Sequence, residues 1–314
     1  MINLFLKQCA GLAMILLFAC APEHSENRQA YVSILPMRYF VEQIAGGRVD
    51  VHVLVGPGQS PETYEPLPRQ VIELSQADLF FRIGVPVEQV LIDRIRENNP
   101  DLSIIDLREG IELQPMETFE ELVSPEDIPA PVDVTDTLVS EAPESHHHDG
   151  LDPHIWTSPR LVKIQAETIY RALAEMDPAN REEYRRNLEA FTGELDRLSA
   201  DIAARFDGVE QRKFMVFHPA WGYFAREFGL LQLPVEIEGK EPSPRELASI
   251  IDISRREGIR TIFVQPQLTG PSAPAIAESI GGTVVVIDPL AADYPTNLRA
   301  VAELLRTAMT GDRP

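Results

Sequence analysis

Short runs of consecutive apolar residues alternate with amphipathic stretches along most of the chain after residue 30. The apolar runs have the length of strands, and the stretches between them have the period of helices. In the first part of the chain we predict strands over 31–37, 49–55, 77–83 and 103–107, with helices over 38–45, 68–75 and 86–97. Near-continuous apolar strands separated by helices are typical of a parallel sheet that is covered on both faces.

The same alternation restarts at residue 213. Here we predict strands over 214–217, 233–237, 261–265 and 283–287, with helices near 220–229, 244–257, 272–280 and 296–309. The pattern therefore predicts an α/β protein with two similar lobes, which we assign to residues 31–177 and 207–314.

A strongly helical segment over residues 159–206 lies between the two patterns and is interrupted once, at Asp177-Pro178. Pro178 suits the first position of a new helix because its fixed φ is already helical. A helix from 178 to 206 would contain roughly 28 residues and span about 42 Å at about 1.5 Å per residue. We predict that it is a rigid linker helix that joins both lobes.

The composition is acidic, because 49 Asp and Glu against 28 Lys and Arg give a formal net charge of −21. This balance argues against a nucleic-acid partner, since phosphate binding requires clustered basic residues. It is compatible with a cationic ligand. Residues 109–149 contain twelve acidic residues, five prolines and no Lys or Arg. With so few apolar side chains, this segment is predicted to be a mobile surface loop.

The amino-terminal residues have the pattern of a secretory signal. Lys7 precedes an apolar run over 9–19 that is too short to span a membrane comfortably. The run ends in Leu17-Phe18-Ala19-Cys20, which resembles a bacterial lipobox. We predict a signal peptide over 1–20, a lipid attached to Cys20, and a tether over 21–30. The alternative is a cleaved signal with an incidental cysteine. No later apolar stretch has the length of a membrane helix, so the body of the protein is expected to be soluble.

No cysteine follows Cys20, so we expect neither a disulfide nor a thiolate metal site in the mature protein. Any metal would then be bound by His, Asp or Glu. Among the seven histidines, His24 lies in the tether and His52 lies in a predicted strand, where a single His is usually structural. The run His146, His147 and His148 either binds metal ions loosely or is a solvated tract of the acidic loop.

The two remaining histidines occupy positions that suit ligands. His154 follows Pro153 in a rigid loop that enters a helix, and Ser158-Pro159 supply the predicted cap and first residue of that helix. His218 directly follows the strand 214–217, at the carboxyl end where open α/β sheets place ligands.

Two acidic residues lie in comparable positions. Asp288 follows the last predicted strand, and Glu62 lies in the Gly-rich loop after the second predicted strand. Each is a weak signal alone, because an Asp after a strand is often a cap and a Glu in a loop is usually solvated.

Together these stretches resemble the zinc- and manganese-binding proteins of bacterial ABC importers, the ZnuA-like family. The resemblance covers essentially the whole chain after the tether. It rests on the loop ending in Tyr64-Glu65-Pro66, the stretches 152–159 and 217–224, the sequence Asp288-Pro289-Leu290, and the His/acidic loop ahead of Asp152. It implies two α/β lobes joined by one long helix, with a divalent metal in the cleft between them. It also implies four metal ligands, two from each lobe: Glu62, His154, His218 and Asp288.

The family usually has His where this chain has Glu62. Either Glu62 binds the metal, or it turns outward and leaves three protein ligands plus water. Added carboxylate oxygen shifts preference toward harder ions such as Mn²⁺ or Fe²⁺. Zinc-type members, however, have His at the position of His218 and a His-rich loop like that at 146–148, whereas manganese-type members often have Glu in place of His218. Since intrinsic affinity also favours Zn²⁺ at an N/O site, we expect zinc.

The resemblance implies a protein that captures a metal ion in the periplasm or at the outer face of the cell membrane and passes it to an ABC-transporter permease. We expect a monomer without enzymatic activity. A zinc hydrolase would need an open coordination position and a general base. No His-Glu-x-x-His helix, Gly-x-Ser-x-Gly elbow or phosphate loop occurs. A surface adhesin is a further alternative, because the fold alone does not define the function.

Overall fold

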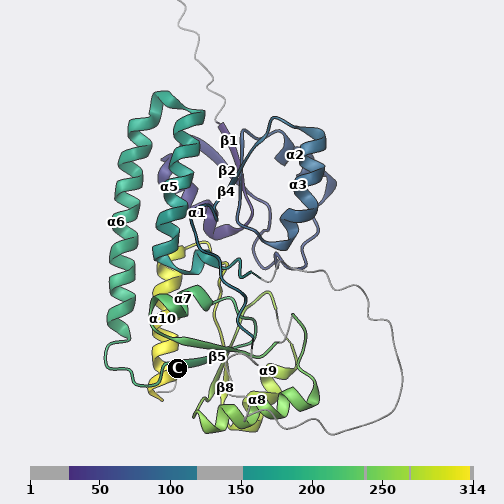
Figure 1. The fold of residues 1–314 in the computed structure, drawn as a ribbon, viewed down its shortest axis with the longest axis vertical. Helices are drawn as coiled ribbons and strands as arrows, with labels where there is room; N and C mark the ends of the chain where they lie inside the picture. The colour runs from purple at the N-terminus through teal and green to yellow at the C-terminus, as the bar shows by residue number, and fades with distance from the viewer. Residues whose placement is uncertain (1–27, 119–150, 237–238, 269, 312–314) are drawn as a thin grey trace, which may run out of the picture.

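Two parallel sheets of four strands each form the centres of two lobes, one above the other in Figure 1. The computed structural model describes residues 28–118, 151–236, 239–268 and 270–311. The first sheet has the order β2-β1-β3-β4, with β1 (Arg28–Val32), β2 (Val49–Val53), β3 (Leu79–Arg82) and β4 (Ser103–Asp106). The second has the order β6-β5-β7-β8, with β5 (Lys213–Val216), β6 (Leu231–Pro234), β7 (Thr261–Val264) and β8 (Thr283–Val286). The lobes repeat one topology, and the predicted α/β fold is confirmed.

Helices connect the strands and surround the sheets. The first lobe contains α1 (Leu35–Ala45), α2 (Pro68–Ser75) and α3 (Pro86–Asn98). The second contains α7 (Gly222–Glu227), α8 (Pro244–Arg256), α9 (Ser272–Ile280) and α10 (Tyr294–Thr310). The segment between the sheets contains η2 (Ile155–Thr157), α5 (Pro159–Met176), η3 (Pro178–Asn180) and α6 (Arg181–Arg205). Within the described ranges, no helix combines the length and the apolar composition that crossing a membrane would require.

The predicted strands all differ from the structure at one or both limits, and two of them differ most. The strand predicted over 31–37 is wrong at its end, because β1 stops at Val32 and α1 begins at Leu35. Pro36 explains the early start, since its fixed φ and missing N–H suit the first turn of a helix. Strand β6 begins two residues before the predicted 233, and its buried Gln232 interrupts the apolar pattern there. The Gln232 amide is satisfied by the backbone of Trp221 and Pro219.

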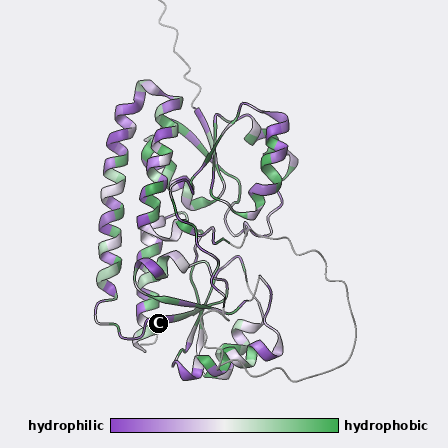
Figure 2. Ribbon diagram, in the orientation of Figure 1, coloured by the Kyte–Doolittle hydropathy of each residue, from purple (hydrophilic) through white to green (hydrophobic). Residues whose placement is uncertain are grey.

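One hydrophobic core continues through both lobes, and a second core lies on the far side of the second sheet. Alternate side chains of β5 show this division. Phe214 and Val216 belong to the shared core, whereas Met215 joins the core beneath α8 and α9. Successive residues of a strand point to opposite faces, so β5 separates the two cores. Figure 2 shows the largely hydrophobic strands of both sheets.

Helix α6 runs alongside both lobes (Figure 1). It packs against α1 of the first lobe and α10 of the second, as well as against α5. Its 25 residues span about 38 Å at about 1.5 Å per residue. Its buried side chains recur every three or four residues, which gives one apolar stripe: Tyr184, Leu188, Phe191, Leu195, Leu198 and Ile202. The predicted linker helix therefore contacts both lobes, although its first turn, η3, is a 3₁₀ helix. The assigned lobe boundaries stay a prediction.

Several predicted features lie outside the described residues. These are the signal peptide with Cys20, the tether except for residues 28–30, and His146, His147 and His148. The start of the predicted acidic loop is described: Ile111 and Leu113 pack against the shared core, and Pro115 pairs with Leu151 in an antiparallel bridge. The described start of this segment is therefore attached to the core by its few apolar residues.

A buried carboxylate organises the carboxyl edge of the first sheet. Glu88, in the first turn of α3, accepts hydrogen bonds from the Ser33 hydroxyl (2.5 Å) and from the backbone N–H groups of Ile83 (2.8 Å) and Gly84 (2.7 Å). Burial raises the pKa of Glu88, and these hydrogen bonds offset part of that effect. The contacts tie the loop after β1 to the loop after β3.

Candidate metal centre

Three predicted ligand side chains from distant segments converge at one place. Glu62 comes from the loop after β2, His154 immediately precedes η2, and His218 directly follows β5. One potential ligand atom from each side chain lies within 4.8 Å of those of the other two. The histidines are buried and Glu62 is half-buried. The Nε2 atoms of His154 and His218 are 3.3 Å apart, although 64 positions separate the residues in sequence.

Two buried carboxylates orient these histidines. Asp152 Oδ1 lies 2.7 Å from His154 Nδ1 and also accepts the backbone N–H of His154 at 2.9 Å. Glu236 Oε1 lies 2.6 Å from His218 Nδ1. A carboxylate oxygen accepts hydrogen bonds, so these contacts assign the ring proton to each Nδ1 and leave each Nε2 lone pair available to bind a cation. The two lone pairs face each other, an arrangement that favours a cation between them.

The electrostatics of the site also favour a cation. Burial is the largest single effect on the pKa of His218 and lowers it, but the hydrogen bond and charge of Glu236, together with nearby acidic groups, raise it by more. The charges of Glu62 and Asp152 act in the same direction. The net effect is a raised pKa of His218, which is the direction expected where acidic groups favour positive charge. Either a proton on the imidazole or a metal ion at Nε2 can supply that charge.

The loop that carries His154 is held at both of its ends. At its start, the Tyr223 hydroxyl donates to the Asp152 carbonyl oxygen at 3.0 Å. At its end, Ser158 caps α5 by accepting the Leu161 N–H at 3.2 Å, which confirms the predicted cap. Glu227 of α7 accepts hydrogen bonds from the Ser158 hydroxyl and from the Arg160 N–H. Because α7 belongs to the second lobe, these contacts fix His154 relative to His218.

Asp288, the fourth predicted ligand, is outside the cluster formed by the other three. Its Oδ1 accepts hydrogen bonds from Gln267 Nε2 at 2.8 Å and from the Leu290 N–H at 2.9 Å. Metal binding by Asp288 therefore stays a prediction. His52, predicted to be structural, stacks on Tyr31 with 5.0 Å between ring centroids, and its Nε2 lies 2.5 Å from Gln29 Oε1.

Sequence reasoning did not identify the supporting carboxylates Asp152 and Glu236. Asp152 had a local signal, since it lies two residues before His154. Glu236 required the sheet register. Strands β5 and β6 are parallel neighbours in which Val216 pairs with Pro234. His218 and Glu236 each follow these paired residues by two positions, so the sheet places them side by side.

A small cavity adjoins the cluster. Its volume is about 10 Å³, and its lining includes Glu62, His154, His218, Trp156, Gln265 and Gln267. Such a volume has room for a single ion or water molecule. Both lobes contribute to the lining, so the site lies where they meet.

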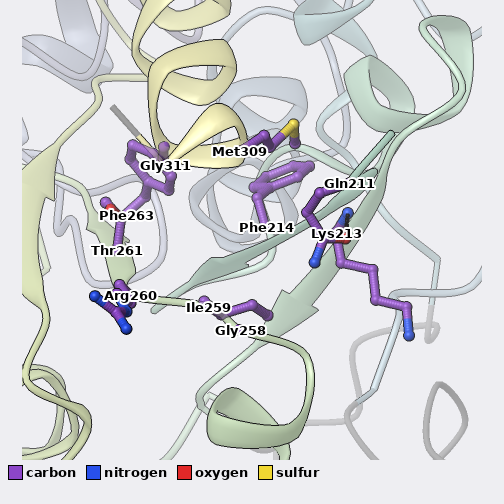
Figure 3. Close-up of a pocket in the computed structure, with 11 residues that line it drawn as sticks. Gln211, Lys213, Phe214, Gly258, Ile259, Arg260, Thr261, Phe263, Met309 and Gly311 are labelled. Atoms are coloured by element: carbon purple, nitrogen blue, oxygen red, sulfur yellow. Dashed lines mark hydrogen bonds between the residues drawn. The ribbon is translucent and has the colours of Figure 1, made fainter. Parts of the chain in front are cut away.

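A larger cavity of about 70 Å³ lies elsewhere, at the amino-terminal ends of β5 and β7 (Figure 3). Phe214, Phe263 and Met309 line it together with Lys213, whose ammonium pairs with Glu257 at 2.8 Å. None of the three clustered side chains lines this cavity. The candidate metal ligands therefore lie beside the smaller of these two cavities.

Comparison with known proteins agrees with this geometry. The family model described as "ZnuA: Zinc-uptake complex component A periplasmic" matches residues 31–308. The chain belongs to the ZnuA family. A crystal structure of ZnuA is 40% identical to it, with a TM-score of 0.76, and the match covers 90% of this chain and 99% of that one. The resemblance identified from the sequence is thereby confirmed.

Two curated relatives have names that specify different metals. The high-affinity zinc uptake system protein ZnuA of Bacillus subtilis is 25% identical over 273 residues, which cover 86% of this chain and 81% of that protein. The manganese-binding lipoprotein MntA of Halalkalibacterium halodurans is 27% identical over 247 residues, which cover 77% of this chain and 72% of that protein. Membership of the ZnuA family thus shows that this is a metal-binding protein, but family membership does not specify which metal it binds.

Proposed function

We propose that this protein captures Zn²⁺ outside the cytoplasmic membrane and delivers it to the permease of an ABC importer. The observation that carries the proposal is the convergence of Glu62, His154 and His218 within 4.8 Å. Both imidazoles present Nε2 to the same point, because Asp152 and Glu236 engage their Nδ1 atoms. Paired carboxylate–histidine contacts of this kind are typical of protein sites that bind transition metals.

The donor set and the available space favour zinc over manganese. Two imidazole nitrogens and one carboxylate oxygen suit the tetrahedral Zn²⁺ ion, with one further ligand. Mn²⁺ is typically bound by more oxygen ligands, in octahedral geometry. The adjoining cavity of about 10 Å³ leaves room for one small ligand rather than three. A Mn²⁺-binding protein of the same type is the alternative, which the manganese-binding relative supports.

The same cavity supports binding rather than catalysis. A hydrolase has to admit its organic substrate to the metal, and the space beside the three side chains is small, about 10 Å³. The buried carboxylates Asp152 and Glu236 are engaged by the histidines instead of being directed at a substrate. These features suit capture and release of the ion itself.

A lipid on Cys20 would hold the protein at the outer face of a membrane, and the run His146–His148 would recruit metal ions. The acidic loop around that run would raise the local cation concentration. We propose that the protein acts as a monomer beside its permease.

Metal analysis of the purified protein tests the function directly. The protein is prepared without added metal, its metal content is measured, and Zn²⁺ and Mn²⁺ are then titrated into the chelator-treated protein by calorimetry. We expect one site per chain and tighter binding of Zn²⁺. Deletion of the gene should reduce growth in zinc-depleted medium, and the wild-type chain should restore it. Absence of a stoichiometric metal site, or unchanged zinc uptake after deletion, would reject the proposal.

A further inference from the structure

Gln267 lines the same small cavity as Glu62, His154 and His218. It follows β7 in the second lobe and donates from Nε2 to Asp288 Oδ1 at 2.8 Å. The other end of its carboxamide, Oε1, is buried and accepts no hydrogen bond from any described residue. A buried carbonyl oxygen without a donor is unusual, because its lost hydration is not replaced.

The orientation of this carboxamide is determined by Asp288. A carboxylate only accepts hydrogen bonds, so the amide nitrogen of Gln267 has to face it and Oε1 has to face away. Asp288 is itself held in place, since its Oδ1 also accepts the Leu290 N–H at 2.9 Å and its carbonyl oxygen accepts Asn297 Nδ2 at 2.7 Å. The chain thus maintains one free acceptor, Gln267 Oε1, beside the candidate metal ligands.

We propose that Gln267 orients a water molecule that completes the coordination of the bound ion. This inference rests on the proposed function. Glu62, His154 and His218 supply three ligands, the water oxygen supplies the fourth, and the water donates a hydrogen bond to Gln267 Oε1. A metal-bound water is a strong donor because the ion withdraws charge from it. Asp288 is then a positioning residue that acts through Gln267 rather than a ligand.

The proposal accounts for two observations together. Asp288 lies outside the ligand cluster, with two donors already on its Oδ1. The cavity of about 10 Å³ has the size of one water molecule. A bound water also exchanges more readily than a carboxylate ligand, so a fourth position filled by water suits a protein that has to release its cargo.

A double-mutant cycle separates the two roles of Asp288. Zinc affinity is measured by chelator competition for the wild type, Gln267→Leu, Asp288→Asn and the double variant. Removing a residue that supports a metal ligand typically lowers metal affinity tenfold or more. We therefore expect Gln267→Leu to bind zinc about tenfold more weakly. Asp288→Asn should lose no more zinc affinity than Gln267→Leu loses. The double variant should bind zinc with the same affinity as Gln267→Leu alone. Additive losses, or a much larger loss for Asp288→Asn, would show direct ligation by Asp288 and overturn the inference.

Anion binding to the Co²⁺-loaded protein tests the water itself. Thiocyanate replaces a metal-bound water but cannot donate a hydrogen bond to Oε1, so the wild type should resist it. Gln267→Leu should bind thiocyanate about tenfold more tightly, as followed by the visible Co²⁺ spectrum. Gln265→Leu is the matched control, because Gln265 lines the same cavity but is not one of the hydrogen-bond donors to the Asp288 carboxylate, and it should behave like the wild type.

The outcomes distinguish this inference from the proposed function. A wild-type protein that binds neither Zn²⁺ nor Co²⁺ would reject the function. Normal metal binding with identical thiocyanate affinities in the wild type and in the Gln267 and Gln265 variants would reject only the role of Gln267. Circular dichroism checks that each variant folds, and Gln267→Met provides the same comparison should the Leu variant not fold.

Discussion

Trp156 donates its indole N–H to the carbonyl oxygen of Pro289 at 2.7 Å, across 133 positions of sequence. Trp156 is buried and lies two residues after His154, and their ring centroids are 5.0 Å apart. Pro289 directly follows Asp288. This hydrogen bond therefore connects the loop that carries His154, a proposed metal ligand, to the segment that follows β8 in the other lobe.

Replacing Trp156 by Phe should destabilise the protein and weaken metal binding. The substitution leaves the buried Pro289 carbonyl without a donor, which costs about 2 kcal/mol in addition to the lost packing. The free energy of unfolding is measured in urea and the zinc Kd by chelator competition. Trp221→Phe is the matched control, because Trp221 is equally buried but its indole N–H donates to no described residue. Equal losses in both variants would mean that packing alone matters at position 156.

His218→Ala should weaken zinc binding far more than deletion of residues 146–148. The His218→Ala substitution removes an imidazole that points at the proposed ion. Removal of a supporting residue can lower metal affinity roughly a hundredfold, and we expect a larger reduction for His218→Ala. The deletion of residues 146–148 removes only histidines that are proposed to recruit metal. His52→Ala is the control histidine, since His52 contacts Gln29 and Tyr31 instead of the site. Equal losses for the first two variants would place the main site in the loop.

Zinc affinity should fall on acidification, and the fall should begin above pH 6.5. A proton competes with the metal for Nε2 of His218, and Glu236 raises the pKa of this imidazole against the opposing effect of burial. Glu236→Gln removes the negative charge, so the midpoint of the fall should move to lower pH. The zinc Kd measured from pH 5 to 8 for both proteins checks this. A flat profile for the wild type would contradict imidazole ligation.

Acidification should weaken zinc binding, but in the metal-free protein the raised pKa of His218 makes the folded state more stable at low pH. A His with a raised pKa in the folded state contributes stability that is fully present below its unfolded pKa of about 6.5. That contribution is lost as the pH rises through the raised pKa of folded His218. Urea unfolding with chelator present should show that Glu236→Gln removes this part of the pH dependence. An unchanged pH dependence would mean that His218 is not coupled to Glu236.

Glu62→His should shift selectivity toward zinc. A third imidazole replaces a carboxylate oxygen, and imidazole ligands favour Zn²⁺ over Mn²⁺ more strongly than carboxylates do. Competition between Zn²⁺ and Mn²⁺ for the wild type and the variant gives the ratio of affinities. Glu65→His is a suitable control, because Glu65 lies in the same loop but is exposed and outside the cluster. An unchanged ratio in Glu62→His would exclude Glu62 from the coordination sphere.

The sequence was sufficient to predict the fold because the α/β pattern is strong and repeated. Helix α2 was predicted with its observed limits, Pro68–Ser75. The strand predicted over 31–37 failed at its end because apolar continuity outweighed Pro36, whose place in the first turn of α1 is decided by backbone geometry. Local apolar patterns therefore located the elements more reliably than their ends.

The candidate site was predictable only in part. His154 and His218 could be found because each has a local signal, a rigid loop or the end of a strand. The pairing of His218 with Glu236 depends on strand register, which no local pattern specifies. The contact between Gln267 and Asp288 spans 21 positions and two separate loops, so it required coordinates.

Helix α6 restricts how this protein can move. It packs on α1 and on α10 at once, and the hydrophobic core beneath it is continuous between the lobes. Swinging the lobes apart like a hinge would expose that core to water and lose its hydrophobic stabilisation. We therefore expect ion entry and exit to proceed through shifts of the short segments around Glu62 and Gln267. A transporter that distinguishes loaded from empty protein must then sense changes of a few side chains rather than a change of overall shape.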